Sequence, residues 1–311
     1  MTTKAVLPYN NRIHPYFGTA TCLLLSITMI VFGKEVKDGI YSGLGFCFTT
    51  ILPTLFPFFI LSDLWASCYY INTNGHIARC FERLFKINGC AISSVVCGLI
   101  CGFPMGVKLS SKLYENGRIT KGELEGLCGF VNNPSLAFVV SGVGLGMLGS
   151  IKHGITLYIA VIISALLVGM FFSKKREFIS KSDENSRQSF NLTKSIGSAG
   201  ISSVSICSFI IFFSGLIGLI SSVIKSHSAT AVISGFLEIS NAVKMIAACD
   251  EFPLQIRLIL IAFALGFSGL SVHLQAFSFL PAEISRSKYL LMKLLQGVIC
   301  SVIMMFFLLI K

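Results

Sequence analysis

The stretch CGFPMGVKLSSKLYENGRIT, residues 101–120, changes character within a few positions. It begins as an apolar run that Gly102, Pro104 and Gly106 interrupt, and it continues as a charged, helix-forming sequence that contains Lys108. Such a break inside a membrane segment frees backbone N–H and C=O groups, which need partners because hydrocarbon offers none. We therefore expect residues 101–106 to form the tip of a re-entrant hairpin that faces protein or a polar cavity.

The composition is that of an integral membrane protein. Of the 311 residues, 54% are apolar and only 13% are charged, whereas about 25% of a typical soluble domain is charged. The mean hydropathy of +0.79 leaves too little polar surface for a protein surrounded by water. Long apolar stretches favour helices over the alternating strands of a β-barrel. The predicted fold class is therefore an all-α polytopic membrane protein.

Seven apolar stretches are predicted to cross the bilayer, since a crossing helix needs about 20 apolar residues. Two further stretches, 90–126 and 229–250, are expected to dip into the membrane as re-entrant hairpins and return to the same side. Residues 75–88 show helical periodicity of apolar and charged positions, which predicts an amphipathic helix on the membrane surface. The predicted crossings are residues 16–33, 41–62, 127–149, 154–173, 196–224, 254–280 and 289–310.

The distribution of basic residues predicts a cytoplasmic N-terminus. With that orientation most of the 25 Lys and Arg residues fall on cytoplasmic segments, including those of 286–293, as the positive-inside rule requires. The net charge of +11 is therefore assigned to membrane topology and not to nucleic-acid binding. The predicted organisation is 1–89 (N-terminal spans and interfacial helix), 90–173 (first repeat), 174–195 (cytoplasmic loop) and 196–311 (second repeat).

The interrupted segments occur in an order that is repeated. CGFPMG (101–106) is followed by VNNPSLAF (131–138), and LEISNAV (237–243) is followed by GFSGLSVHLQ (266–275). The predicted orientation makes the two hairpins enter from opposite faces of the membrane. This pattern is typical of an inverted-topology repeat with a substrate site at the midplane, built from discontinuous helices.

Glu238 is the most informative single residue, because a carboxylate in an apolar segment is costly and is functional by default. The alternatives are a salt bridge to Lys244 or a position near the membrane surface. His273 could carry a proton or pack through hydrogen bonds. Lys108 could attract an anion or extend to the cytoplasmic surface.

The candidate substrate-binding residues are drawn from the four interruptions. The alternative for the polar ones is that they only join helices at a bend, and Pro104 could be a simple kink. The predicted site consists of Gly102, Phe103, Pro104, Met105, Gly106, Asn132, Asn133, Pro134, Ser135, Glu238, Ser240, Asn241, Ser268, Gly269, Ser271 and Gln275.

Sequence patterns for enzymes and cofactors are missing. The chain has no GxxxxGK[ST], HExxH or GxSxG pattern, so we expect no direct use of ATP, no catalytic site and no cofactor. The 11 cysteines include no C-x-x-C pair and lie mostly in apolar segments. They are interpreted as small core residues in a reducing compartment, and no metal site is expected.

The same motifs resemble the YlbJ-type sporulation integral membrane proteins of the nucleoside-recognition (Gate) domain group. The resemblance rests on GFPMG, NNPS, LEISN and GFSGLSVHLQ and extends from about residue 40 to 300. It implies a fold similar to that of concentrative nucleoside transporters, in which two re-entrant hairpins and two unwound helices surround one substrate site. It assigns Gly102–Gly106 to the tip of the first hairpin and Asn132–Ser135 to the first unwound helix. It assigns the region of Glu238 to the second hairpin and the region of Ser268 to the second unwound helix.

The resemblance also implies a function. It points to the export of dipicolinic acid from the mother cell across the outer forespore membrane during sporulation. The first tip, Phe103-Pro104-Met105, has no carboxamide or acid to bind a ribose, and this fits a flat aromatic anion better than a nucleoside. The alternatives are a transporter of nucleosides or related solutes and a non-transporting membrane scaffold for spore assembly. A coupling ion, either Na⁺ or a proton, and a homo-oligomer are compatible with this reading.

Overall fold

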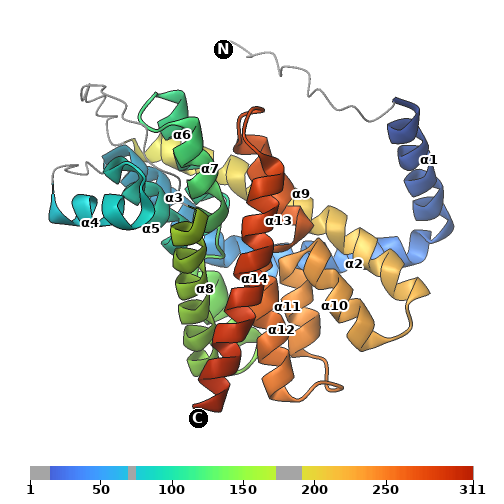
Figure 1. Cartoon of the computed structure of the whole chain (residues 1–311). Helices are drawn as coiled ribbons and strands as arrows, with labels where there is room; N and C mark the ends of the chain where they lie inside the picture. Colours follow the sequence, from blue (N-terminus) through green and yellow to red (C-terminus); the bar gives the residue numbers. More distant parts are fainter. Residues whose placement is uncertain (1–14, 69–74, 173–190, 311) are drawn as a thin grey trace.

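The computed structural model describes residues 15–68, 75–172 and 191–310 (Figure 1). Within these ranges all regular structure is helical, which confirms the all-α prediction. Residues 1–14 and most of the predicted loop 174–195 lie outside the described residues. The helices are α1 (Pro15–Val31), α2 (Gly33–Phe46), η1 (Cys47–Ile51), α3 (Leu52–Cys68), α4 (His76–Phe85), η2 (Gly89–Ala91), α5 (Ile92–Ile100), α6 (Met105–Glu115), α7 (Lys121–Val131), η3 (Phe138–Met147), α8 (Ile151–Phe172), α9 (Leu192–Val223), α10 (His227–Leu237), α11 (Ile239–Ala247), α12 (Leu254–Phe267), α13 (Gly269–Phe279) and α14 (Arg286–Leu309).

Five helical segments in the described part of the chain are long and apolar enough to cross a membrane. Two of the seven predicted crossings are shorter than expected, because α1 is short and the stretch 127–149 is divided between α7 and η3. The pair formed by α4 and the η2–α5 segment is bent by 97° and is a sixth candidate, either a broken span or a re-entrant loop. The five segments are Gly33–Leu61, Ile151–Phe172, Leu192–Val223, Leu254–Phe279 and Arg286–Leu309.

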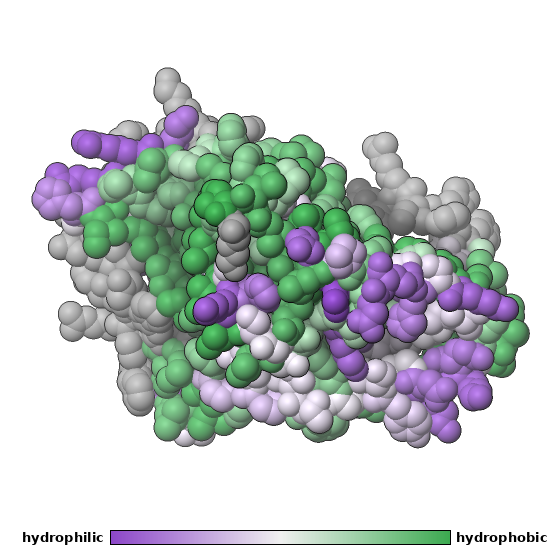
Figure 2. All heavy atoms as spheres, turned by 90° about the horizontal axis from the view of Figure 1, so that it is seen from below, coloured by the Kyte–Doolittle hydropathy of each residue, from purple (hydrophilic) through white to green (hydrophobic). Residues whose placement is uncertain are grey.

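The surface of the molecule is largely hydrophobic. Figure 2 shows broad apolar areas interrupted by hydrophilic patches. Large side chains such as Ile201, Phe171 and Leu309 are more than 70% exposed, which in water would be strongly unfavourable. The exposed apolar helices therefore establish an integral membrane protein.

The amphipathic stretch 75–88 forms α4 as predicted, and its apolar residues divide between two surroundings. Phe81 and Phe85 are buried, and the Phe85 ring stacks on that of Phe130 with centroids 5.2 Å apart. Ile77 and Leu84 are 78% and 51% exposed. The helix is therefore attached to the core by one part of its apolar face and presents the other part outward.

Each of the two stretches expected to form a re-entrant hairpin contains two short helices that pack against each other. In the first, α5 and α6 are joined by residues 101–104 and pack against each other. Both helices of this hairpin lie close to the end of α7. This contact requires Gly98 and Gly106, since a Cβ atom at either position would overlap the carbonyl oxygen of Val131. In the second, α10 and α11 meet at Glu238, which has an extended backbone between the two helices.

The continuous helix α2–η1–α3 packs along α9 in an antiparallel arrangement. Its N-terminal part approaches the C-terminal end of α9, where a Cβ on Gly218 would overlap the carbonyl oxygen of Glu35. At the other end, Ser195 Oγ donates to Asp63 Oδ2 at 2.9 Å. Figure 1 shows these long helices running across α8 and α14, which lie side by side.

Small residues determine how closely α2 and α9 approach. A Cβ at Gly39 would overlap the backbone carbonyl oxygen of Ser214, whereas a Cβ at Gly45 on the same helix would meet nothing within 4 Å. We expect Gly39→Ala to destabilise the protein by about 1–3 kcal/mol through overpacking. Gly45→Ala should be neutral or stabilising by up to about 1 kcal/mol, because Ala is the better helix former. Thermal unfolding of the two variants in detergent measures the difference, and equal melting temperatures would contradict this packing.

Apart from α1, α4 and η2, the helices follow the same order twice along the chain. A long helix, a hairpin of two short helices, an interrupted helix and a straight helix appear as α2–α3, α5/α6, α7/η3 and α8. They appear again as α9, α10/α11, α12/α13 and α14. The second interrupted helix breaks at Ser268, whose backbone φ is 78°, and resumes at Gly269, with φ of 77°. Each interruption thus lies where the sequence predicted it.

Candidate functional site

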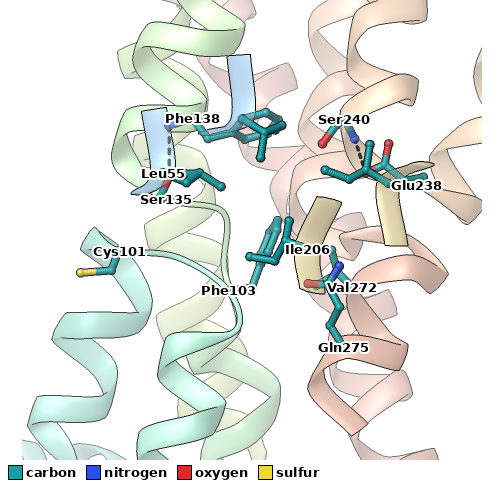
Figure 3. A pocket seen from close by; sticks show the side chains of 12 residues that line it. Leu55, Cys101, Phe103, Ser135, Phe138, Ile206, Glu238, Ser240, Val272 and Gln275 are labelled. Atoms are coloured by element: carbon teal, nitrogen blue, oxygen red, sulfur yellow. Dashed lines mark hydrogen bonds between the residues drawn. The ribbon is translucent and has the colours of Figure 1, made fainter. Parts of the chain in front are cut away.

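A cavity lies where the two hairpin tips and the two interrupted helices meet. Figure 3 shows Ser135 and Phe138 on one side of it, Glu238 and Ser240 on the other, and Phe103 and Ile206 between them. The volume open to the centre of a water molecule is about 10 Å³, which is roughly the room for one water. The cavity is lined by Ile51, Leu55, Cys101, Phe103, Ser135, Phe138, Ile206, Ile210, Glu238, Ser240, Val272 and Gln275.

The first hairpin tip rests on the first interrupted helix. The N–H of Phe103 donates to the carbonyl oxygen of Asn133 at 2.8 Å. The backbone of the hairpin tip and the backbone of the interruption at 132–135 therefore satisfy each other at this bond. Gly102, with φ of 81°, lies against the backbone of Ser135. Ser135 Oγ in turn accepts the N–H of Phe138 at 3.1 Å and caps the helix that follows. The tip and the break therefore form one closely packed unit.

The second hairpin tip is organised by Glu238. Its carboxylate accepts the N–H groups of Ser240 (3.0 Å) and Asn241 (2.7 Å) and the Asn241 side-chain amide (2.9 Å). Asn241 Nδ2 also donates to Ser214 Oγ of α9 at 2.7 Å. Glu238 is 1% exposed, and Gly269 of the second interrupted helix lies against its backbone. The carboxylate thus caps α11 and also lines the cavity.

The salt bridge from Glu238 to Lys244 does not form. The carboxylate bonds the start of α11 and not Lys244, and the residue is buried inside the protein, away from solvent. The Lys244 ammonium lies 6.0 Å from the centroid of the Phe46 ring. A second, more open hollow of about 570 Å³ adjoins this lysine. That hollow is lined by Tyr41, Ser42, Gly45, Phe46, Thr49, Thr50, Gly146, Met147, Lys244, Ala247 and Ala248.

Asn132 and Asn133 contact α14. Asn132 Nδ2 donates to the hydroxyl of Tyr289 at 2.7 Å, and Gln296 Nε2 donates to Asn133 Oδ1 at 2.7 Å. Lys293 Nζ donates to the backbone carbonyl oxygen of Asn132 at 2.7 Å and to Gln296 Oε1 at 2.8 Å. These five residues, which we call the α14 network, are all fully buried. They join the first interrupted helix to α14.

Lys293, which the topology count placed with the basic residues of 286–293, does not lie in an exposed segment. The residue lies inside α14 and is 0% exposed. Lys293 lies near the start of a long apolar stretch and close to Arg286 and Lys288. In the sequence it therefore resembles a charge that flanks a membrane span. The carbonyl freed at Asn132 gives this lysine a buried partner, which the local sequence does not reveal.

Of the 16 predicted site residues, those that line the cavity are Phe103, Ser135, Glu238, Ser240 and Gln275. Gly102, Pro104, Met105, Gly106, Pro134 and Gly269 are buried around the breaks. Asn132 and Asn133 belong to the α14 network, and Asn241 supports Glu238. Ser268 Oγ donates to the carbonyl oxygen of Leu265 at 3.3 Å, and Ser271 Oγ accepts from Gln275 Nε2 at 3.5 Å.

The other polar residues singled out in the sequence lie outside the cavity wall. His273 Nδ1 is 3.2 Å from the Tyr289 hydroxyl, at the edge of the α14 network. Lys108 Nζ donates to Ser198 Oγ of α9 at 3.3 Å and is partly buried. Among the described residues, no group of three or more His, Cys, Asp or Glu side chains is placed to hold a metal ion.

The sequence reasoning missed the apolar part of the cavity. Ile51, Leu55, Ile206, Ile210 and Val272 line it from α2–η1–α3, α9 and α13. Phe138, which ends the VNNPSLAF stretch, also lines it. Apolar residues in apolar helices carry no local signal that distinguishes a cavity wall from a lipid-facing surface.

One curated protein is similar over nearly the whole chain. The chain is 28% identical over 342 residues to the sporulation integral membrane protein YlbJ of Bacillus subtilis (strain 168). The aligned region covers 95% of this chain and 83% of that protein. The chain matches no protein-family model and no solved structure. It is therefore an integral membrane protein similar, along nearly its full length, to a protein named for sporulation.

Proposed function

We propose that this chain is a secondary transporter of a small organic anion, and that dipicolinate is the anion. The proposed setting is the outer forespore membrane during sporulation, with the N-terminus in the cytoplasm and export from the mother cell. The observation that carries the proposal is the small cavity where two hairpin tips and two interrupted helices meet beside the buried Glu238. The similarity to a protein named for sporulation supports the setting.

The proposed architecture is an inverted repeat. Its support is the repeated order of elements, together with the antiparallel packing of the two long helices that begin each half. Equivalent helices that run in opposite directions place the two hairpins on opposite sides of the membrane. A site between such halves can be opened to either side in turn when one half moves against the other.

The cavity has groups suited to a flat aromatic anion. Phe103 and Phe138 can contact the ring faces, and the hydroxyls of Ser135 and Ser240 can donate to carboxylate oxygens. The N–H groups in the first turn of α6, which begins at Met105 directly after the tip, carry partial positive charge. Pyridine-2,6-dicarboxylate carries about two negative charges at neutral pH, since its carboxyls are ordinary acids.

Glu238 links transport to protons in this proposal. An ionised Glu238 would repel a dianion in a cavity this small and largely apolar. A protonated Glu238 would remove the repulsion and retain one oxygen to accept a hydrogen bond. We therefore propose that a proton binds Glu238 when the anion enters, so that proton and anion move together.

The structure corresponds to a closed state in this scheme. A cavity with room for about one water cannot hold a pyridine dicarboxylate until a hairpin tip moves away from its interrupted helix. The open hollow beside Lys244 would then be the entrance on one side, where a cation raises the local anion concentration.

Proteoliposomes that contain the purified chain test the proposal. We expect saturable uptake of labelled dipicolinate, absent from protein-free liposomes and increased when the outside is more acidic than the inside. Matched arms use uridine as a nucleoside and succinate as a non-aromatic dicarboxylate. Uptake of uridine without dipicolinate would favour the nucleoside alternative. No uptake of any solute by correctly inserted protein would overturn the transport proposal in favour of a scaffold.

A further inference from the structure

Lys293 is a buried amine that the proposed anion site does not use. Its side chain is 0% exposed, within a helix that is long and apolar enough to cross the membrane. Among the described residues, no carboxylate lies within 4.0 Å of its ammonium group. A buried charge without an opposite partner is expensive in a membrane protein and indicates a function.

The partners of the ammonium group are neutral oxygens. The backbone carbonyl of Asn132 lies 2.7 Å from Nζ, and Gln296 Oε1 lies 2.8 Å away. Both distances are those of charge-assisted hydrogen bonds. The Asn132 carbonyl is available because α7 ends at Val131 and residues 132–135 are not helical. The lysine therefore holds a carbonyl that the helix interruption exposes.

The neighbouring side chains make the surroundings rich in oxygen. Asn133 Oδ1 is held by Gln296 Nε2 at 2.7 Å, so the amide that bonds Lys293 is itself fixed to the interruption. Asn132 Oδ1 is buried and has no hydrogen-bond partner. Tyr289, Lys293 and Gln296 are spaced so that they share one face of α14, and this face is directed to the break.

Backbone carbonyls of unwound helices are the ligands that bind coupling cations in many transporters. Amide and carbonyl oxygens without a carboxylate suit a monovalent cation better than a divalent one. The position held by Nζ has such oxygens, and the chain fills it with the amino group of its own lysine. A cation that is covalently attached cannot leave during a transport cycle.

We propose that Lys293 is a tethered cation that takes the place of a bound coupling cation at the first interrupted helix, so that the protein works without Na⁺ or K⁺. Lys293 is a positioning residue in this scheme, because it acts by keeping the Asn132–Ser135 break in its packed form. The role of Lys293 in coupling rests on the proposed transport function. Its test measures binding of cations and needs no transported solute.

Thermal unfolding of the full chain in detergent provides the test, in chloride salts of Na⁺, K⁺ and choline at equal ionic strength. The wild type should melt at the same temperature in all three salts. Lys293→Ala removes the ammonium and leaves space beside the exposed oxygens, so it should melt lower in choline. Na⁺ or K⁺ should then restore part of the loss in a saturable way, by about 3 °C or more. The control Lys152→Ala, at an exposed position of α8, should remain insensitive to the cation.

Two results would overturn the inference. One is a wild type that Na⁺ or K⁺ stabilises saturably relative to choline, because the position would then bind a free ion. The other is a Lys293→Ala variant that melts lower but equally in all salts, which would make the lysine a structural group only. Should Lys293→Ala not fold, the wild-type series decides, since indifference to the cation supports the tethered charge and saturable stabilisation rejects it. All of these results are independent of whether dipicolinate is transported.

Discussion

Glu238→Gln should reduce dipicolinate uptake by at least about tenfold, which corresponds to about 1.4 kcal/mol or more, while the protein still folds and inserts. Glutamine has nearly the same shape but cannot take up or release a proton. Without the proton step, the cavity loses the group that is proposed to link anion entry to the gradient. The buried position of Glu238 at the cavity wall makes this the strongest effect expected of any single conservative change.

The fold should be weakened only moderately by the same change. Glutamine keeps one oxygen that can accept from Ser240 or Asn241, but it loses the charge-assisted part of these bonds. We expect the free energy of unfolding to fall by about 1–2 kcal/mol. The measurement combines uptake into proteoliposomes at matched protein density with thermal unfolding of the same preparation.

The matched control is Glu251→Gln, the same chemical change at an exposed position of the chain. It should leave both uptake and melting temperature unchanged. Normal, gradient-stimulated uptake by Glu238→Gln would show that the carboxylate only caps α11, and the proton-coupled part of the proposal would have to be abandoned.

The interruptions of the fold could be predicted because each breaks a local rule. Glycine and proline at 101–106, the NNPS at 132–135 and a carboxylate at 238 are all unfavourable in an uninterrupted membrane helix. Residues that violate local preferences mark functional or strained positions in many proteins. The helices are interrupted at these three places and again at Ser268, and five of the predicted side chains reach the cavity wall.

The parts that could not be predicted depend on contacts between distant segments. The pairing of Asn132 with Lys293 joins positions that nothing in the local sequence relates. The first long helix begins at Gly33, although the predicted crossing began only at residue 41. Charged residues can form part of the end of a membrane helix when neighbouring helices or the membrane surface accommodate them.

Gly102→Ala should be the most destabilising small substitution in the chain, because two separate costs combine at this residue. Its φ of 81° is a conformation that costs an L-residue about 1–2 kcal/mol. A Cβ there would lie 2.5 Å from the Ser135 backbone nitrogen and 2.9 Å from its Cα atom. Neither is the end of a flexible side chain, so overpacking should add about 1–3 kcal/mol.

The chain contains a control that separates these two costs. Gly149 also has a positive φ, of 63°, but a Cβ at that position would meet nothing within 4 Å. Gly149→Ala should therefore lower the melting temperature only by the conformational strain, and it should leave dipicolinate uptake intact. Gly102→Ala should melt several degrees lower than Gly149→Ala, at roughly 2–4 °C for each additional kcal/mol, and should lose uptake.

The comparison decides whether the first tip must sit directly on the backbone of the first interrupted helix. If both variants melt together and both transport, the contact between Gly102 and Ser135 is not required, and the closed cavity is not the state that the hairpin stabilises. If only Gly102→Ala loses stability and uptake, the close packing of tip on break is a condition for transport. That packing leaves no room for a larger residue than glycine, and this is the physical reason for the interrupted GFPMG sequence.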